Sequence, residues 1–148
     1  MSMTLPDETI ATPETTWATL AMLRREPKFV PHEYPPLGYT GPDTPEDLEP
    51  LTEIVDQAID GSLALRAEAL SASILRPILV QAQQQADMFA TEDRDRVWGY
   101  MLEIWYIVGF RVSLFGAPYG PYFQVPDGYG EPLPPGWNAP DQPRRFES

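Results

Sequence analysis

One carboxylate interrupts the most apolar stretch of the sequence. Residues 97 to 115 read VWGYMLEIWYIVGFRVSLF, with Glu103 near the middle and Arg111 further along. A carboxylate among apolar side chains has a raised pKa and can exchange a proton with a substrate. It can also form a buried ion pair, here with Arg111 or Arg96. We expect the ion pair between Glu103 and Arg111, which makes Glu103 a structural residue.

His32 is the only histidine and lies in Pro31-His32-Glu33-Tyr34. Any Ser-His-Asp site would have to use it, and a metal site with two histidines is excluded. No known motif places a serine or an acid beside it. The chain has no cysteine, so disulfides, thiol nucleophiles and thiolate metal sites are excluded as well. We therefore expect no catalytic residue, no metal site and no cofactor.

Acidic side chains are concentrated between Asp43 and Asp60, where seven carboxylates occur without a basic residue. Such a run is either a solvated helix face or a docking surface whose field attracts a basic partner. The second interpretation makes a partner-binding surface of Asp43, Glu46, Asp47, Glu49 and Glu53. A second acidic run, residues 92 to 96, lacks the spacing of a calcium loop and instead suits the positive end of a helix dipole.

The overall charge restricts the class of partner. Ten basic and 22 acidic side chains give a formal charge of −12 in 148 residues. Nucleic-acid binding depends on lysine and arginine contacts to phosphates, so this charge argues against it. A protein partner, either a larger subunit or a basic protein, fits the composition.

Proline positions define the expected architecture. Nine of the 18 prolines lie in residues 1–50 and eight in residues 118–148, and only Pro77 lies between. Because proline interrupts continuous helix, the centre can be helical while the ends cannot. We expect one mainly α domain: a small bundle of about four helices over residues 44–116, with an irregular Pro-rich N-terminal arm (1–43) and an aromatic, Pro-rich C-terminal tail (117–148).

Apolar spacing and helix-end signals place the four helices. The first covers about residues 13–25 within the N-terminal arm. The second begins at Pro45 or Pro50 and ends at Gly61. The third covers 63–90 and is kinked at Pro77, and the fourth covers 91–115 and ends at Gly116. The fourth helix is apolar all round beyond Val97, so the tail or another chain must complete its cover.

The apolar stretch 97–115 also requires a membrane test. Its 19 residues nearly reach the length of a spanning helix, but Glu103 and Arg111 would be costly inside a bilayer. We expect a buried helix of a soluble protein and no membrane association. The first residues contain no basic and apolar signal segment, so the expected location is the cytoplasm.

The tail differs from an ordinary disordered segment, which is poor in aromatic residues. Eleven of the 17 aromatic residues lie between Trp98 and Trp137. We expect the tail to pack on its own bundle or on a partner, through Tyr119, Tyr122, Phe123, Tyr129 and Trp137.

Three functions are compatible with these features. The first is a non-catalytic interaction module, an accessory or structural subunit of a multisubunit enzyme or virus-like particle, which uses its arms to contact neighbouring subunits. The alternative is an acidic inhibitor or immunity protein that neutralises a basic partner. The third is a small enzyme using Glu103 or His32. We favour the accessory subunit, with no catalytic activity of its own.

Overall fold

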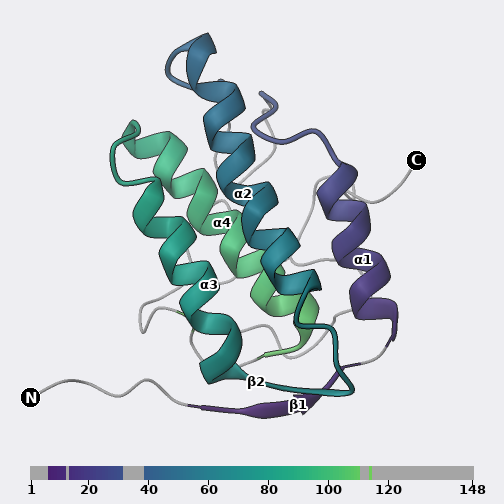
Figure 1. Ribbon diagram of the computed structural model, residues 1–148. Helices are drawn as coiled ribbons and strands as arrows, with labels where there is room; N and C mark the ends of the chain where they lie inside the picture. Colours follow the sequence, from purple (N-terminus) through teal and green to yellow (C-terminus); the bar gives the residue numbers. More distant parts are fainter. Residues whose placement is uncertain (1–6, 13, 32–38, 111–113, 115–148) are drawn as a thin grey trace, which may run out of the picture.

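The computed structural model describes residues 7–12, 14–31, 39–110 and 114, and within them it is a helical bundle (Figure 1). Its helices are α1 (Glu14–Arg25), α2 (Leu48–Leu63), α3 (Ala72–Gln85) and α4 (Thr91–Val108), and a short 3-10 helix, η1 (Pro45–Asp47), precedes α2. Helix α4 contacts the other three, and α2 contacts both α1 and α3. The predicted mainly α bundle of four helices is confirmed, as is the short helix in the N-terminal arm.

A two-stranded antiparallel sheet closes one end of the bundle. Strand β1 (Thr9–Ala11) pairs with β2 (Ala69–Ser71), with Ile10 opposite Leu70. Leu70 is buried between exposed or half-buried neighbours, which is the alternation of a strand. The prediction of one helix over 63–90 is therefore wrong at its start, and α3 also ends earlier than predicted, at Gln85. Helix α2 continues past Gly61 to Leu63, and α3 begins only at Ala72.

The segment before β1 also supports the start of α3. The amide of Ser73 donates a hydrogen bond of 3.0 Å to Oδ1 of Asp7, so a residue distant in sequence satisfies one of the free donors of this helix end. This bond, followed by a second from the Glu8 amide, lowers the pKa of Asp7. Helix α3 then continues through Pro77, so the proline does not divide the helix, and the kink at Pro77 stays a prediction.

Helix α4 ends earlier than predicted. Its last residue is Val108, and Gly109 follows with a φ of 122° that side chains rarely adopt. The amides of Gly109 and Phe110 both donate to the carbonyl of Trp105, which closes the helix end. The prediction that Gly116 ends this helix is thus wrong, because a positive φ is already required at Gly109.

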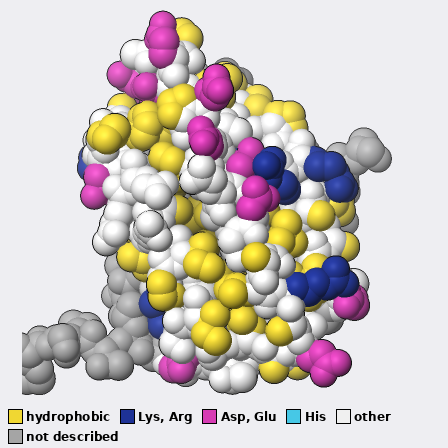
Figure 2. Space-filling view, viewed as in Figure 1, with side chains coloured by type: hydrophobic (Ala, Val, Ile, Leu, Met, Phe, Trp, Pro, Cys, Tyr) yellow, Lys and Arg dark blue, Asp and Glu magenta, His cyan; other side chains and the backbone are white. Residues whose placement is uncertain are grey.

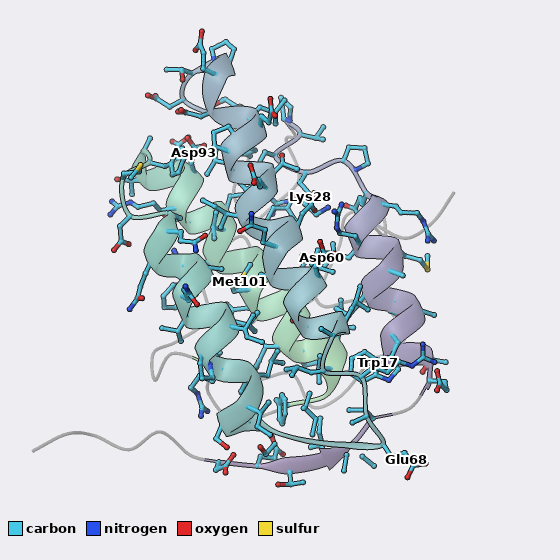
Figure 3. All side chains as sticks on the ribbon, viewed as in Figure 1. Trp17, Lys28, Asp60, Glu68, Asp93 and Met101 are labelled. Atoms are coloured by element: carbon cyan, nitrogen blue, oxygen red, sulfur yellow. The ribbon has the colours of Figure 1, made fainter. Side chains whose placement is uncertain are left out.

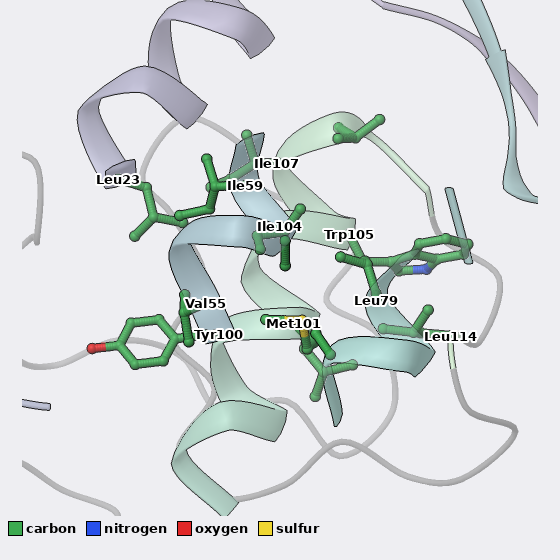
Figure 4. Close-up of a cluster of buried hydrophobic side chains, with 14 of the residues drawn as sticks. Leu23, Val55, Ile59, Leu79, Tyr100, Met101, Ile104, Trp105, Ile107 and Leu114 are labelled. Atoms are coloured by element: carbon green, nitrogen blue, oxygen red, sulfur yellow. The ribbon is translucent and has the colours of Figure 1, made fainter. Parts of the chain in front are cut away.

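The core is built around α4, as Figure 4 shows. Every residue from Gly99 to Val108 is buried, so the prediction that this helix must be covered on all sides is confirmed. Trp105 is fully buried, and its ring centroid lies 4.4 Å from that of Phe110. The Arg76 guanidinium lies 5.1 Å from the centroid of the Trp105 ring. Of the helices in the described residues, none is long and apolar enough to cross a membrane.

The end of α4 gives a first test. A Cβ at Gly109 would lie 3.0 Å from Cδ1 of Ile10, in addition to the strained backbone. We expect Gly109→Ala to lower the free energy of unfolding by about 1–3 kcal/mol, measured by urea denaturation. In an Ile10→Ala background the contact between the new Cβ and Ile10 is removed, but the backbone strain at position 109 remains. Gly109→Ala should therefore lower the free energy of unfolding by a smaller amount in that background, but not by zero. Equal stability of Gly109→Ala and the parent would contradict this account.

Candidate functional site

The acidic run from Asp43 to Asp60 is divided into two parts by its contacts. We call the first part the acidic end of α2, namely Asp43, Glu46, Asp47, Glu49 and Glu53. Asp47 is half-buried and the other four are exposed. No lysine or arginine of the described ranges forms an ion pair with any of them. Figure 2 shows these carboxylates gathered at the upper end of the molecule, over the start of α2.

The second part is neutralised by α1. Arg24 lies 3.1 Å from Asp56 and 2.9 Å from Asp60. The bond to Asp60 raises the pKa of Arg24. Lys28 approaches Asp56 as well, with 2.8 Å between Nζ and Oδ1. Figure 3 shows Lys28 and Asp60 between α1 and α2. The sequence alone does not show which carboxylates are paired, because the basic residues that pair with Asp56 and Asp60 are more than 25 positions away.

Lys28 is the most enclosed charge of this region. Its side chain is 1% exposed, whereas that of Asp60 is 54% exposed. Nζ also donates to the carbonyl oxygens of Arg24 and Glu26, at 3.1 and 3.0 Å. The ammonium group therefore closes the C-terminal end of α1, where the free carbonyls and the helix dipole favour a cation. Asp56 supplies the opposite charge that a buried ammonium requires.

An open hollow of about 730 Å³ extends along the outer side of α2 next to Arg24. Glu46, Glu49 and Glu53 line one part of it, and the paired Asp56 and Asp60 line another. Leu48 also lines it and is 44% exposed, so the hollow includes one large apolar side chain. The hollow thus combines carboxylates that form no ion pair within the described ranges with an apolar contact point, the chemistry that suits a basic and partly apolar protein surface.

A buried carboxylate positions the acidic end. Asp93, in the first turn of α4, is 1% exposed. Its Oδ1 accepts a hydrogen bond of 2.7 Å from the Tyr39 hydroxyl, and its Oδ2 accepts one of 3.0 Å from the Asp43 amide. Burial, and then the bond to Asp93, raises the pKa of Tyr39, so this phenol is a permanent donor. Asp93 was expected only as a helix-start acid, since no local pattern indicates partners 50 and 54 residues away.

A second contact fixes the segment that leaves α1. Phe29 has a φ of 60°, an uncommon value for a residue other than glycine. The Phe29 amide donates a hydrogen bond of 3.1 Å to the Tyr100 hydroxyl, and the ring centroids of Phe29 and Tyr100 lie 5.2 Å apart. The Arg96 guanidinium also lies 4.8 Å from the centroid of the Tyr100 ring. These contacts tie the residues after α1 to α4 and so place Lys28 beside Asp56.

The predicted site residues fare differently in the structure. Glu103 is buried in α4 at 1% exposure and does not line the hollow beside α2. Arg111 and His32 lie outside the described residues, so the ion pair with Glu103 and the enzyme hypothesis for His32 stay predictions. The five tail aromatics, Tyr119, Tyr122, Phe123, Tyr129 and Trp137, also lie outside them. No three histidine, aspartate or glutamate side chains of the described part come together in a metal-binding group.

A protein-family model matches residues 10–114 of the chain, from the middle of β1 to Leu114. The carbonyl of Leu114 accepts a hydrogen bond from Arg76 of α3. This is a helical domain with a small sheet, and the match covers all four helices. The chain belongs to that family, which is described as a domain of unknown function, DUF4844. No curated protein and no solved structure matches the chain.

The two acids that pair with α1 provide a second test. Asp56→Ala leaves the buried Lys28 ammonium without its counter-charge, and we expect it to lower the free energy of unfolding by about 3 kcal/mol. Asp60→Ala is the matched control, because it removes one carboxylate from the same helix. Its ion pair with Arg24 is half-exposed, so the loss should be about 1 kcal/mol or less. Urea denaturation measures both, and equal losses would contradict the assignment.

Proposed function

We propose that the chain is a non-catalytic protein-interaction domain, a small accessory subunit that contacts its partner through the acidic end of α2. The observation that carries this is the division of the acidic run. Two of its carboxylates are paired with α1, whereas the acidic end has no ion pair among the described residues and lies beside the exposed Leu48. Unpaired charges around an apolar contact support a recognition surface.

The partner in this proposal is a protein with a basic surface. A formal charge of −12 repels phosphates, which supports a protein rather than a nucleic acid. A cytoplasmic setting belongs to the proposal too. The anchoring of Asp43 to Asp93 holds the start of η1 in place before binding, and a pre-formed surface loses little entropy on association.

The runner-up is an acidic inhibitor of a basic protein. The same surface favours it, because clustered unpaired carboxylates accelerate association with a basic partner. The two functions differ in what holds the complex. An accessory subunit stays bound to a larger protein at fixed stoichiometry in high salt, whereas a small basic protein held mainly by charge is lost as salt rises.

The test replaces three carboxylates of the acidic end with their amides. The full chain carrying Glu46→Gln, Glu49→Gln and Glu53→Gln is purified from its native source beside the parent, and bound proteins are compared by quantitative native mass spectrometry. We expect recovery of the partner to fall by about tenfold or more, because several charge contacts are lost together. Circular dichroism should be unchanged, since all three side chains are exposed.

A control variant separates the surface from the net charge. Glu68→Gln, Asp87→Asn and Glu92→Gln remove the same charge from exposed positions elsewhere. This control should retain the partner. Equal loss in both variants would mean that net charge alone decides, and retention in both would remove the acidic end from the interface.

A further inference from the structure

Helix α4 contacts its three neighbouring helices on one half of its surface. Thr16 of α1 donates a hydrogen bond of 3.3 Å to the carbonyl of Ile107. The Arg76 guanidinium of α3 lies 5.1 Å from the centroid of the Trp105 ring. Ile104 lies between these two sides, in the buried cluster that Figure 4 shows next to α2. An α-helix turns by about 100° per residue, so these three residues of α4 cover about 160° of its circumference.

The opposite half of α4 is buried as well. Gly99, Leu102 and Tyr106 follow one another at intervals of three and four residues, which places them along one side of the helix. Leu102 lies about 160° around the helix from Ile104. Leu102 is 2% exposed, Tyr106 is 0% exposed, and Gly99 is buried too. We call Gly99, Leu102 and Tyr106 the outer stripe of α4.

The cover of the outer stripe belongs to the chain itself. The stripe is buried within a single chain, so no second molecule is required to remove it from water. Strand β1 approaches the end of α4, where a Cβ on Gly109 would lie 3.0 Å from Ile10. The residues before α2 approach its start, where the Asp43 amide bonds to Asp93. The middle of α4, on the half that α1, α2 and α3 leave open, therefore takes its cover from outside the described ranges.

The chain leaves α4 next to the outer stripe. The positive φ of Gly109 ends the helix and turns the backbone away from the helix axis. Leu114 is buried, and its carbonyl accepts a hydrogen bond of 3.1 Å from Nε of Arg76, so the chain at this point lies beside α3. Trp105, against which Arg76 lies, is about 60° around the helix from Leu102. The residues after Leu114 therefore begin at the edge of the outer stripe.

The sequence after Leu114 has the composition of a segment that packs on an apolar surface. Residues 112–126 contain no charged side chain, in a chain of which 22% of the residues are charged. Within them, Pro118-Tyr119-Gly120-Pro121-Tyr122-Phe123 repeats a proline–tyrosine pair after three residues. Proline favours the polyproline II conformation, which has about three residues per turn. This repeat therefore predicts that Tyr119 and Tyr122 lie on the same side of the segment.

The length of this segment matches the stripe. Gly99 and Tyr106 are separated by about 10 Å along α4, and Tyr119 and Tyr122 by about 9 Å along a polyproline II segment. Tyr119 follows Leu114 by five residues. An extended chain of that length spans about 16 Å, which is enough to pass from the α3 side to the outer stripe.

The other parts of the chain outside the described ranges fit this position less well. Residues 1–6 end at Asp7, which the amide of Ser73 holds at the start of α3. Residues 32–38 end at Tyr39, whose hydroxyl bonds to Asp93 in the first turn of α4. Both parts are much shorter than residues 115–148, which begin beside the stripe.

We propose that residues 118–123 form a strap that covers the outer stripe of α4, with Tyr119 and Tyr122 packed on Leu102 and Tyr106. Gly99 has no side chain, so an aromatic ring of the strap can approach the helix backbone there. The strap assigns three aromatic residues of the tail to contacts within the chain rather than to a partner. It does not depend on the role of the acidic end of α2.

The first experiment measures the accessibility of the outer stripe. The full chain has no cysteine, so Leu102→Cys introduces a single thiol whose reaction with dithionitrobenzoate can be followed. Tyr119→Ser, Tyr122→Ser and Phe123→Ser together should accelerate this reaction at least about tenfold, because the cover is removed. Ile104→Cys is the matched control on the opposite side of α4, and the same three substitutions should leave its reaction rate unchanged.

Three outcomes would overturn the strap. The first is an unchanged rate at position 102. The second is equal acceleration at positions 102 and 104, because the substitutions would then open the whole bundle. The third is a rate at position 102 that falls as the protein concentration rises, because a second copy would then cover the stripe. Tyr129→Ser with Trp137→Ser, further along the tail, should change neither rate, and acceleration by this pair equal to that by the strap substitutions would contradict the assignment to residues 118–123.

The second experiment leaves every buried residue in place. Asp95 is exposed and precedes Gly99 by one turn on the same side of α4. A nitroxide attached to Asp95→Cys in the full chain should broaden the amide NMR signals of residues 119, 120, 122 and 123. The same label on Gln57→Cys, an exposed position on α2, should not broaden them. Equal signals with both labels would overturn the strap, and so would broadening in isotopically enriched chains without a nitroxide that are mixed with unenriched, nitroxide-labelled chains.

Discussion

Helix α4 can exist in water only when it is enclosed, and the rest of the fold provides that enclosure. Its residues from Gly99 to Val108 are all buried, and α1, α2 and α3 each contact it. An apolar helix without a polar side has no stable position at the surface of a small protein. The bundle is therefore organised around its last helix, and each of the other helices directs its apolar side toward it.

The buried polar groups near this core each have a hydrogen-bond or ion-pair partner, which offsets the cost of removing them from water. Asp93 is buried at the start of α4 and holds Tyr39 and the Asp43 amide, while Lys28 is buried at the end of α1 and meets Asp56. Each of these contacts joins segments far apart in sequence. A buried charge that requires its partner penalises any arrangement in which the partner is elsewhere. These contacts thus hold the described parts of the connector between α1 and α2, residues 26–31 and 39–47, and the surface at the start of α2 depends on them.

The helices were accessible from sequence because their signals are local. Proline at the ends, apolar spacing in the centre and acidic first turns all act within a few residues, and α1 was predicted almost to the residue. The two strands were not accessible, since each has only three residues and its partner lies 60 positions away. The end of α4 was misplaced because a glycine at either position 109 or position 116 can end a helix, and only the structure shows the positive φ at Gly109.

The sequence shows that acidic residues are concentrated in this segment, but it does not show which of them form the candidate binding surface. A run of seven carboxylates is visible in the sequence, yet nothing in it indicates that Arg24 and Lys28 neutralise two of them. Asp93 gave a local signal, that of a helix-start acid, which concealed its contacts with Tyr39 and Asp43.

Lys28 is the only lysine of the chain, and its side chain is 1% exposed. The folded protein therefore presents no side-chain amine to solvent. Acylating reagents, amine-directed cross-linkers and any enzyme that modifies lysine reach this group only after the end of α1 separates from Asp56. The accessibility of one nitrogen atom thus reports the opening of the bundle at that point, and a single chemical label distinguishes the closed from the opened form.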